Sequence, residues 1–229
     1  RFYNKLHSTS KVDPEVVNDS NRTSTFAICF AVLQQRTFTL MAQTLAYYNR
    51  VMPGARTYAY LASRTSDVRR AYGLDDATTQ IVWKQVLPSG YRQDRQVDYA
   101  IRQQGQYLAY NDFLNRFRHR HEWMLFVDGD DWLRAPSRVL DRVAKMNSSV
   151  CAVTIPWVTY DVSKTDPARM TFRGKQAAVR NVSRHESKNM VHAHQALSIS
   201  IHNTDECIKG RSVTAKDMHV AHLRFPNQY

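Results

Sequence analysis

The sequence predicts an α/β fold: a mixed, mostly parallel sheet flanked by helices, with antiparallel additions in the C-terminal half. Strand-like and helix-like segments alternate through the first half of the chain, the pattern of parallel strands joined by helices. Residues 123–127 are apolar throughout, as expected of a strand buried on both faces. After residue 150 strand-like segments outnumber helical ones, which predicts the antiparallel additions.

The individual elements follow from hydrophobic period and from turn residues. Residues 1–24 are polar without a clear period, and we expect an arm ahead of one domain over residues 25–229. Helical spacing over residues 34–51 stops at Pro53-Gly54, a typical helix end. A long helix with a broad apolar face is expected at residues 92–118. The remaining expected elements are strands at 25–33, 55–62, 79–87, 123–127, 150–160, 174–182, 190–201 and 219–225, and helices at 67–72 and 137–146.

Composition describes an ordinary globular protein with a basic surface. Of its 229 residues 43% are hydrophobic, and the formal net charge is +12. Such a charge favours anionic partners, so a basic nucleic-acid-binding module is one alternative function. The sequence contains no recognised nucleic-acid-binding motif, and nucleic acid is therefore not the expected partner.

Targeting signals are sparse. The longest apolar stretch, residues 26–33, is too short to cross a bilayer, and the chain does not begin with Met, so membrane attachment is expected only through an anchor preceding Arg1. Cys29 and Cys151 lie in apolar runs and are expected in the core, and no disulfide framework is expected. Four glycosylation acceptor patterns favour a Golgi or secretory lumen slightly over the cytoplasm: Asn18, Asn21, Asn147 and Asn181.

The most informative feature is an acidic turn directly after the apolar strand. Asp128, Asp130 and Asp131 follow Val127, and such crowded carboxylates resist ionisation unless a counter-charge is present. A divalent cation is the simplest counter-charge, and hard oxygen ligands suit Mg²⁺ or Mn²⁺. The alternative is structural: Asp130 or Asp131 caps a helix that has Pro136 in its first turn. Ligands of parallel α/β sheets bind beyond the carboxyl ends of the strands, which is where this turn lies.

Four segments, in this order, resemble glycosyltransferase family 92 of the GT-A fold over about residues 26–226. They are residues 106–116 with the pair Asn111-Asp112, residues 122–136 with Asp128-Gly129-Asp130, residues 188–203 with Lys188 and His202, and residues 221–224 with His222 and Arg224. The chain differs from the family pattern in having Asp130-Asp131-Trp132 where Asp-Glu-Phe is usual, His222-Leu223 where His-Tyr is usual, and Gln34-Gln35-Arg36 after the first strand.

The resemblance implies a metal-dependent transfer of a sugar from a UDP- or GDP-sugar donor to a hydroxyl of a glycan or glycoconjugate. A Mn²⁺ or Mg²⁺ ion would neutralise the leaving diphosphate. By resemblance Asp130, Asp128 and His222 hold the metal, Asp128 also reaching the ribose. Residues 25–133 would form the nucleotide-binding half and residues 134–229 the acceptor-binding half.

The resemblance also assigns catalytic and donor-binding residues. Asp131 and His202 are the expected catalytic residues, on the acceptor side. The expected donor-binding residues are Asp128, Asp112, Lys188 and Arg224. Residues 30–33 would form the floor of the base site, with Tyr58 and Tyr60 either stacking on the base or lying in the core. The general base is left open among Asp161, Glu186, Asp205 and Asp217.

A second enzymatic alternative is a Mg²⁺-dependent phosphatase-like hydrolase with an aspartyl nucleophile. Such enzymes also place an Asp-X-Asp motif after a strand. They carry it near the start of the chain and follow it with a small hydroxyl residue, whereas here about half the chain precedes the motif and the corresponding residue is Trp132.

Overall fold

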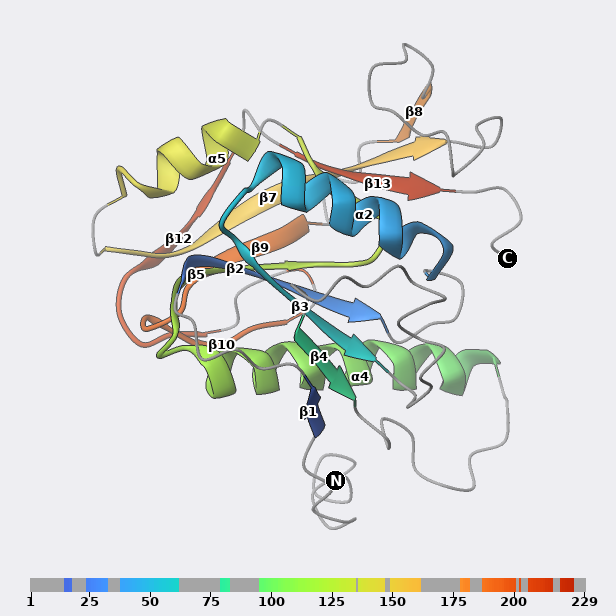
Figure 1. Ribbon diagram of the computed structural model, residues 1–229, viewed down its shortest axis with the longest axis horizontal. Helices are drawn as coiled ribbons and strands as arrows, with labels where there is room; N and C mark the ends of the chain where they lie inside the picture. Colours follow the sequence, from blue (N-terminus) through green and yellow to red (C-terminus); the bar gives the residue numbers. More distant parts are fainter. Residues whose placement is uncertain are drawn as a thin grey trace.

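The computed structural model shows a curled sheet between two layers of helices (Figure 1). It describes residues 15–17, 24–32, 38–61, 79–82, 95–134, 136–146, 149–161, 178–181, 187–200, 202, 206–215 and 219–224. Eleven of the described strands form one sheet in the order β1-β4-β3-β2-β5-β9-β7-β13-β6, with β12 and β8 also paired to β7. Within these residues no helix has the length and hydropathy needed to cross a bilayer.

The N-terminal half is built on parallel strands. Strand β2 (Ser24–Val32) lies between β3 (Arg56–Leu61) and β5 (His121–Val127), parallel to both, and β4 (Thr79–Val82) continues the parallel order beyond β3. The short strand β1 (Glu15–Val17) closes this edge by antiparallel pairing with β4. The carboxyl ends of β2, β3 and β5 therefore meet along one rim of the sheet.

The C-terminal half continues the same sheet with mixed pairing. Strand β9 (Ser187–His192) runs antiparallel to β5 and to β7 (Val150–Asp161). Strand β7 in turn lies parallel to β13 (Val220–Arg224) and β12 (Arg211–Thr214). The smaller strands are β6 (Asp131–Leu133), antiparallel to β13, β8 (Ala178–Asn181), antiparallel to β7, and the separate pair β10 (Ala196–Ser198) and β11 (Glu206–Cys207).

Two apolar cores cover the two faces of the sheet. Helices α2 (Phe38–Val51) and α5 (Pro136–Val143) lie on one face, and the long helix α4 (Arg95–Phe117) lies on the other (Figure 1). Alternation along β5 explains this division, because Leu125 and Val127 enter the core beneath α2 whereas Met124 and Phe126 enter the core beneath α4. The sheet is thus buried on both faces, as the apolar run at residues 123–127 predicted.

The predicted α/β fold with a mixed sheet is confirmed. The predicted helices at 34–51, 92–118 and 137–146 correspond to α2, α4 and α5, and Gly54, at φ +92°, follows the end of α2 as the Pro-Gly pair predicted. Strands β1, β6, β11 and β12 were not predicted, because each has two to four residues and carries no period of its own. The helix expected at 67–72 lies outside the described residues.

The structure contains one disulfide, although no disulfide framework was expected. Cys151 of β7 is bonded to Cys207 of β11, with their Cα atoms 6.1 Å apart, while Cys29 is a buried free thiol. The pairing could not be read from the sequence, because Cys151 and Cys207 are 56 residues apart. Cys29 also lies in an apolar run, as Cys151 does, so the local sequence did not show which of them is paired. The bond fixes β11, and with it the β10–β11 pair, to a central strand.

Removing this disulfide should destabilise the fold. Closing a loop of 56 residues restricts the unfolded chain, and the loss is expected to be about 2–4 kcal/mol. The variant in which Cys151 and Cys207 are both alanine should lose this much free energy of unfolding in urea titrations, and reductant should lower the stability of the wild type alone. Thiol titration of the denatured, unreduced protein should find one free thiol; three would contradict the pairing.

His121, at the start of β5, is a buried neutral imidazole. Its Nδ1 donates to the carbonyl of Ser24 at 3.0 Å, and its Nε2 accepts from the hydroxyl of Tyr58 at 2.7 Å. His121 is only 2% exposed. Burial, together with the charges of Arg56 and Arg120, lowers the pKa of His121 from 6.5 to about 4.

This histidine should make the fold sensitive to mild acid. The imidazole has a pKa of 6.5 in the unfolded chain and of about 4 in the folded chain, so on acidification the unfolded chain takes up the proton first. The free energy of unfolding therefore falls as the pH drops between these values, by about 2 kcal/mol at pH 5. His121→Gln should remove this component when urea unfolding at pH 7.5 and pH 5 is compared. The matched control is His119→Gln at an exposed position; an equal change in the two variants would refute the assignment.

Candidate functional site

The acidic turn connects β5 to β6 at the rim where the parallel strands end. The backbone N–H of Asp131 donates to the carbonyl of Asp128 at 3.2 Å, which closes the turn around Gly129 and Asp130. The chain then enters β6, where Asp131 faces His222 across the antiparallel pair with β13. Sequence-distant β13 is thereby brought beside the turn.

Helix α2 holds the turn from the opposite side. Thr44 donates its hydroxyl to the carbonyl of Gly129 at 2.6 Å and accepts the indole N–H of Trp132 at 2.9 Å. Tyr48 donates to the carbonyl of Asp131 at 3.1 Å. These contacts are buried, so the backbone of the acidic turn is fixed independently of any ligand. The structural alternative is not supported: Asp131 lies in β6, and no hydrogen bond among the described residues joins either aspartate to α5, which begins at Pro136.

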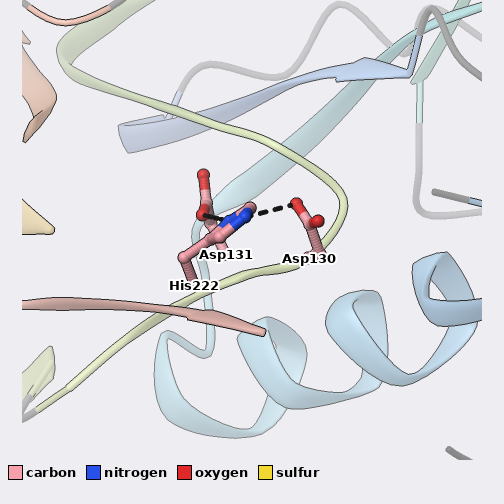
Figure 2. A group of neighbouring side chains, drawn as sticks. All are labelled: Asp130, Asp131 and His222. Atoms are coloured by element: carbon pink, nitrogen blue, oxygen red, sulfur yellow. Dashed lines mark hydrogen bonds and ion pairs between the residues drawn. The ribbon is translucent and has the colours of Figure 1, made fainter. Parts of the chain in front are cut away.

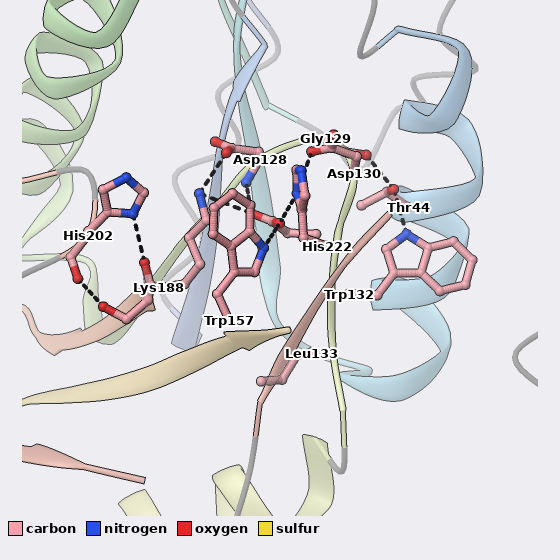
Figure 3. A network of polar contacts seen from close by, with 12 residues as sticks. Thr44, Asp128, Gly129, Asp130, Trp132, Leu133, Trp157, Lys188, His202 and His222 are labelled. Carbon is pink, nitrogen blue, oxygen red and sulfur yellow. Dashed lines mark hydrogen bonds and ion pairs between the residues drawn. The ribbon is translucent and has the colours of Figure 1, made fainter. Parts of the chain in front are cut away.

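Lys188 supplies one counter-charge that the sequence analysis had assigned to a metal. Its side chain is 0% exposed, and Nζ lies 2.6 Å from Oδ2 of Asp128 and 3.1 Å from Oδ2 of Asp131 (Figure 3). Nζ also lies 5.4 Å from the ring centroid of Trp157. The two carboxylates raise the pKa of Lys188 against the opposing effect of burial, so the ammonium stays charged.

Asp131 lies beneath the site and is completely buried. Oδ2 accepts from the backbone N–H of Asp128 at 2.8 Å and from Lys188, and Oδ1 accepts from Trp157 Nε1 at 3.1 Å and from His222 Nδ1 at 3.0 Å. Burial alone would raise its pKa, but Lys188 and His222 outweigh burial and lower the pKa to about 2. Asp131 is therefore an anion with both oxygens occupied.

Asp130 contrasts with Asp131 although the two are adjacent. Oδ1 of Asp130 is buried, accepts no hydrogen bond from the described residues and lies 3.6 Å from Nδ1 of His222 (Figure 2). Burial, the nearby His222 and the two neighbouring aspartates together leave its pKa raised to about 6. This oxygen has the longer ion pair with His222 but no hydrogen-bond donor among the described residues, and a hard cation would supply a closer partner.

His222 completes a group that fits a divalent metal. One ligand atom from each of Asp130, Asp131 and His222 lies within 4.8 Å of the others. The charges of Asp130 and Asp131 outweigh burial and raise the pKa of His222, so the acidic turn favours a positive charge at this position. The oxygen and imidazole donors suit Mn²⁺.

Asp128 points from the turn toward helix α4. Its Oδ1 accepts from the amide of Gln106 and from the hydroxyl of Tyr110, the latter at 3.2 Å, while Oδ2 accepts from Lys188. Its side chain remains 23% exposed, so it can still contact a ligand at the rim. Gln106 and Tyr110 are one helical turn apart, which is why both reach the same carboxylate.

Two other predicted residues lie elsewhere or are only partly described. Asp112 forms a bidentate ion pair with Arg116, at 3.0 and 3.1 Å, and accepts from Tyr60 at 2.5 Å, so the structure places it in a separate network on α4. Arg224 lies in β13, two residues after His222, and its side chain is outside the described residues.

His202 lies beside Trp157. Its Nδ1 donates to the carbonyl of Ser187 at 3.2 Å, its own carbonyl accepts from the Ser187 hydroxyl, and its ring lies 6.0 Å from that of Trp157. Trp157 also contacts the His222 ring edge-to-face at 4.1 Å. Among the four residues left open as the base, none has a described side chain.

Sequence reasoning missed Trp157, Gln106 and Tyr110. The two α4 residues had a detectable signal, since polar and aromatic side chains spaced by four in a helix share a face. Trp157 had none, because a tryptophan in a strand is most often a core residue. For Tyr58 and Tyr60 the core alternative is correct: both are 0% exposed and pack beneath α4.

Comparison with solved structures found distant likenesses. One is to the mannosyltransferase PcManGT from Pyrobaculum calidifontis, in complex with GDP-Man and Mn²⁺, at 12% identity and a TM-score of 0.49, covering 99% of this chain and 64% of that one. Another is to a mycobacterial protein at 14% identity and a TM-score of 0.37, covering 67% and 52%. The chain thus spans less than two thirds of either structure, and neither likeness bears on its donor or cation.

Sequence comparison gives the family. A search of curated proteins found no match to this chain. The profile of glycosyltransferase family 92, in contrast, matches residues 24–229, which include the acidic turn, Lys188 and His222. This match covers nearly the whole chain and confirms the resemblance seen in its motifs. The chain therefore belongs to glycosyltransferase family 92.

Proposed function

We propose that the protein is a divalent-metal-dependent enzyme that moves a sugar from a nucleoside-diphosphate donor to a hydroxyl of a glycan or glycoconjugate. The observation that carries the proposal is the buried oxygen of Asp130, which has no hydrogen-bond donor among the described residues and faces His222. Family membership makes sugar transfer the relevant chemistry and argues against the phosphatase and nucleic-acid alternatives.

In this proposal Asp130 and His222 hold Mn²⁺, or Mg²⁺ with lower preference. The cation, when bound, supplies a Lewis acid for the charge that develops on the leaving diphosphate. Asp128 faces the rim and contacts the ribose or the water shell of the cation. Lys188 is buried, so we assign it to holding Asp128 and Asp131 instead of contacting the donor itself.

The acceptor side is assigned to the surroundings of Trp157 and His202. His202 is the candidate catalytic residue there, because its ring flanks Trp157 next to the metal group. Arg224 follows His222 along β13 and remains a candidate for neutralising the diphosphate. A secretory lumen is the proposed compartment, supported by the disulfide, which is typical of oxidising compartments, and by the four glycosylation patterns.

A panel of UDP- and GDP-sugars, with and without Mn²⁺, tests the function by thermal shift. A ligand at a hundred times its Kd stabilises the native state by about 2.7 kcal/mol, which corresponds to roughly 5–10 °C for a chain of this size. We expect one nucleotide sugar to give such a shift only when Mn²⁺ is present. The proposal fails if no nucleotide sugar shifts the transition in Mn²⁺, or if the chain instead hydrolyses a generic phosphate ester.

A further inference from the structure

The two neighbouring aspartates of the acidic turn differ in what occupies their oxygens. Asp131 accepts four hydrogen bonds or ion pairs at 2.8–3.1 Å and is 0% exposed, whereas the buried Oδ1 of Asp130 accepts no hydrogen bond from the described residues and has only the longer ion pair with His222 Nδ1, at 3.6 Å. A carboxylate that bound a cation directly would have to give up one of these four contacts. Asp130 would give up no hydrogen bond at Oδ1, where its only described ion pair is the one of 3.6 Å with His222.

We infer that Asp131 is a positioning residue that orients His222 toward the cation and is not itself a metal ligand or a catalytic residue. The inference rests on the proposed metal-dependent function and assigns the sequence-predicted catalytic Asp131 a different role. A carboxylate can only accept hydrogen bonds, so Nδ1 of His222 carries the hydrogen of the 3.0 Å contact. That assignment leaves Nε2 as the nitrogen that can bind a metal.

The surroundings keep Asp131 in this orientation. Trp157 Nε1 shares Oδ1 with His222, and the Trp157 ring also packs edge-to-face on the imidazole at 4.1 Å, so one side chain restrains both partners. Lys188 and the Asp128 N–H hold the other oxygen. Carboxylates that orient metal-binding histidines in this way usually contribute 10–100-fold to metal affinity.

A double-mutant cycle on Mn²⁺ affinity, measured without donor by the EPR signal of free Mn²⁺, tests the inference. Asp131→Asn should weaken Mn²⁺ binding by a factor of about 10 or more in the wild type. In a His222→Gln background the same substitution should weaken it by a factor at least about ten times smaller, because Asp131 acts through His222. Asp128→Asn is the matched control: it removes a charge from the same turn without contacting His222 in the described hydrogen bonds, and its effect should be equal in both backgrounds. Equal losses from Asp131→Asn in both backgrounds would overturn the inference.

The wild-type protein gives an independent answer if Asp131→Asn does not fold. A crystal structure with Mn²⁺ should show the ion bonded to Asp130 and to Nε2 of His222, with all four contacts of Asp131 retained. An Asp131 oxygen or His222 Nδ1 bonded to the ion would refute the positioning role while leaving the proposed function standing. A wild type that binds no Mn²⁺, with or without a nucleotide sugar, would overturn both.

Discussion

Asp130→Asn is expected to abolish Mn²⁺-dependent donor binding while making the metal-free protein more stable. Asp130 is buried next to two other aspartates, and its pKa is raised from 3.8 to about 6. The folded protein therefore binds this proton more tightly than the unfolded chain, and the free energy of unfolding falls as the pH rises from 3.8 to 6. At pH 7 the buried charge destabilises the metal-free fold by up to about 3 kcal/mol, which asparagine should recover.

Two measurements separate these effects. Urea unfolding of the metal-free variant at pH 7 should give a higher free energy of unfolding than the wild type, and the difference should vanish near pH 4. Thermal shift with Mn²⁺ and the donor should show no stabilisation of the variant. Normal donor binding by Asp130→Asn would remove this residue from the proposed metal site, and a loss of stability at pH 7 would refute its assignment as a destabilising buried charge.

Lys188→Met is expected to cause the largest loss of stability. The substitution leaves two carboxylates, one of them fully buried, without their shared cation, and breaking a buried ion pair in this way typically costs about 3–5 kcal/mol. The pKa of Asp131 is low partly because of Lys188, so this carboxylate contributes stability above pH 3.8 that is lost as the pH falls toward 2. Without Lys188, acid unfolding should begin at a higher pH.

The matched control is Lys145→Met, which removes the same charge from an exposed position. Its free energy of unfolding should stay within about 0.5 kcal/mol of the wild type. Adding Asp131→Asn to Lys188→Met should restore part of the lost stability, because it removes one of the stranded charges. If Lys188→Met behaves like Lys145→Met in urea titrations, the buried lysine is not what holds the acidic turn together.

The sequence predicted the site's location better than its electrostatics. The apolar strand ending in Asp128, Asp130 and Asp131 placed the rim correctly, because strand period and parallel topology act over short distances along the chain. The expectation that a divalent cation is the counter-charge of these carboxylates left out Lys188, which supplies one. Lys188 lies 57 residues beyond Asp131 and reaches it through the pairing of β9 with β5, a contact that no local pattern reveals.

The same limit explains the other differences between sequence and structure. The position of Asp112 in a family motif did not reveal its ion pair with Arg116, one helical turn away, and its donor-binding role stays a prediction. The Cys151–Cys207 bond and the role of Trp157 depend on strands that meet only in the folded sheet. Local patterns thus gave the framework, and the partners of each charged group required the tertiary structure.

The continuous sheet restricts how this protein can close over its substrates. Strands β5 and β9 are hydrogen-bonded neighbours, so the proposed nucleotide-binding and acceptor-binding halves share one continuous sheet. Enzymes that close by hinge rotation have two bodies joined by a few flexible residues. Rotation between the two proposed halves would break a central ladder, so any movement that excludes water from the site has to leave this sheet intact.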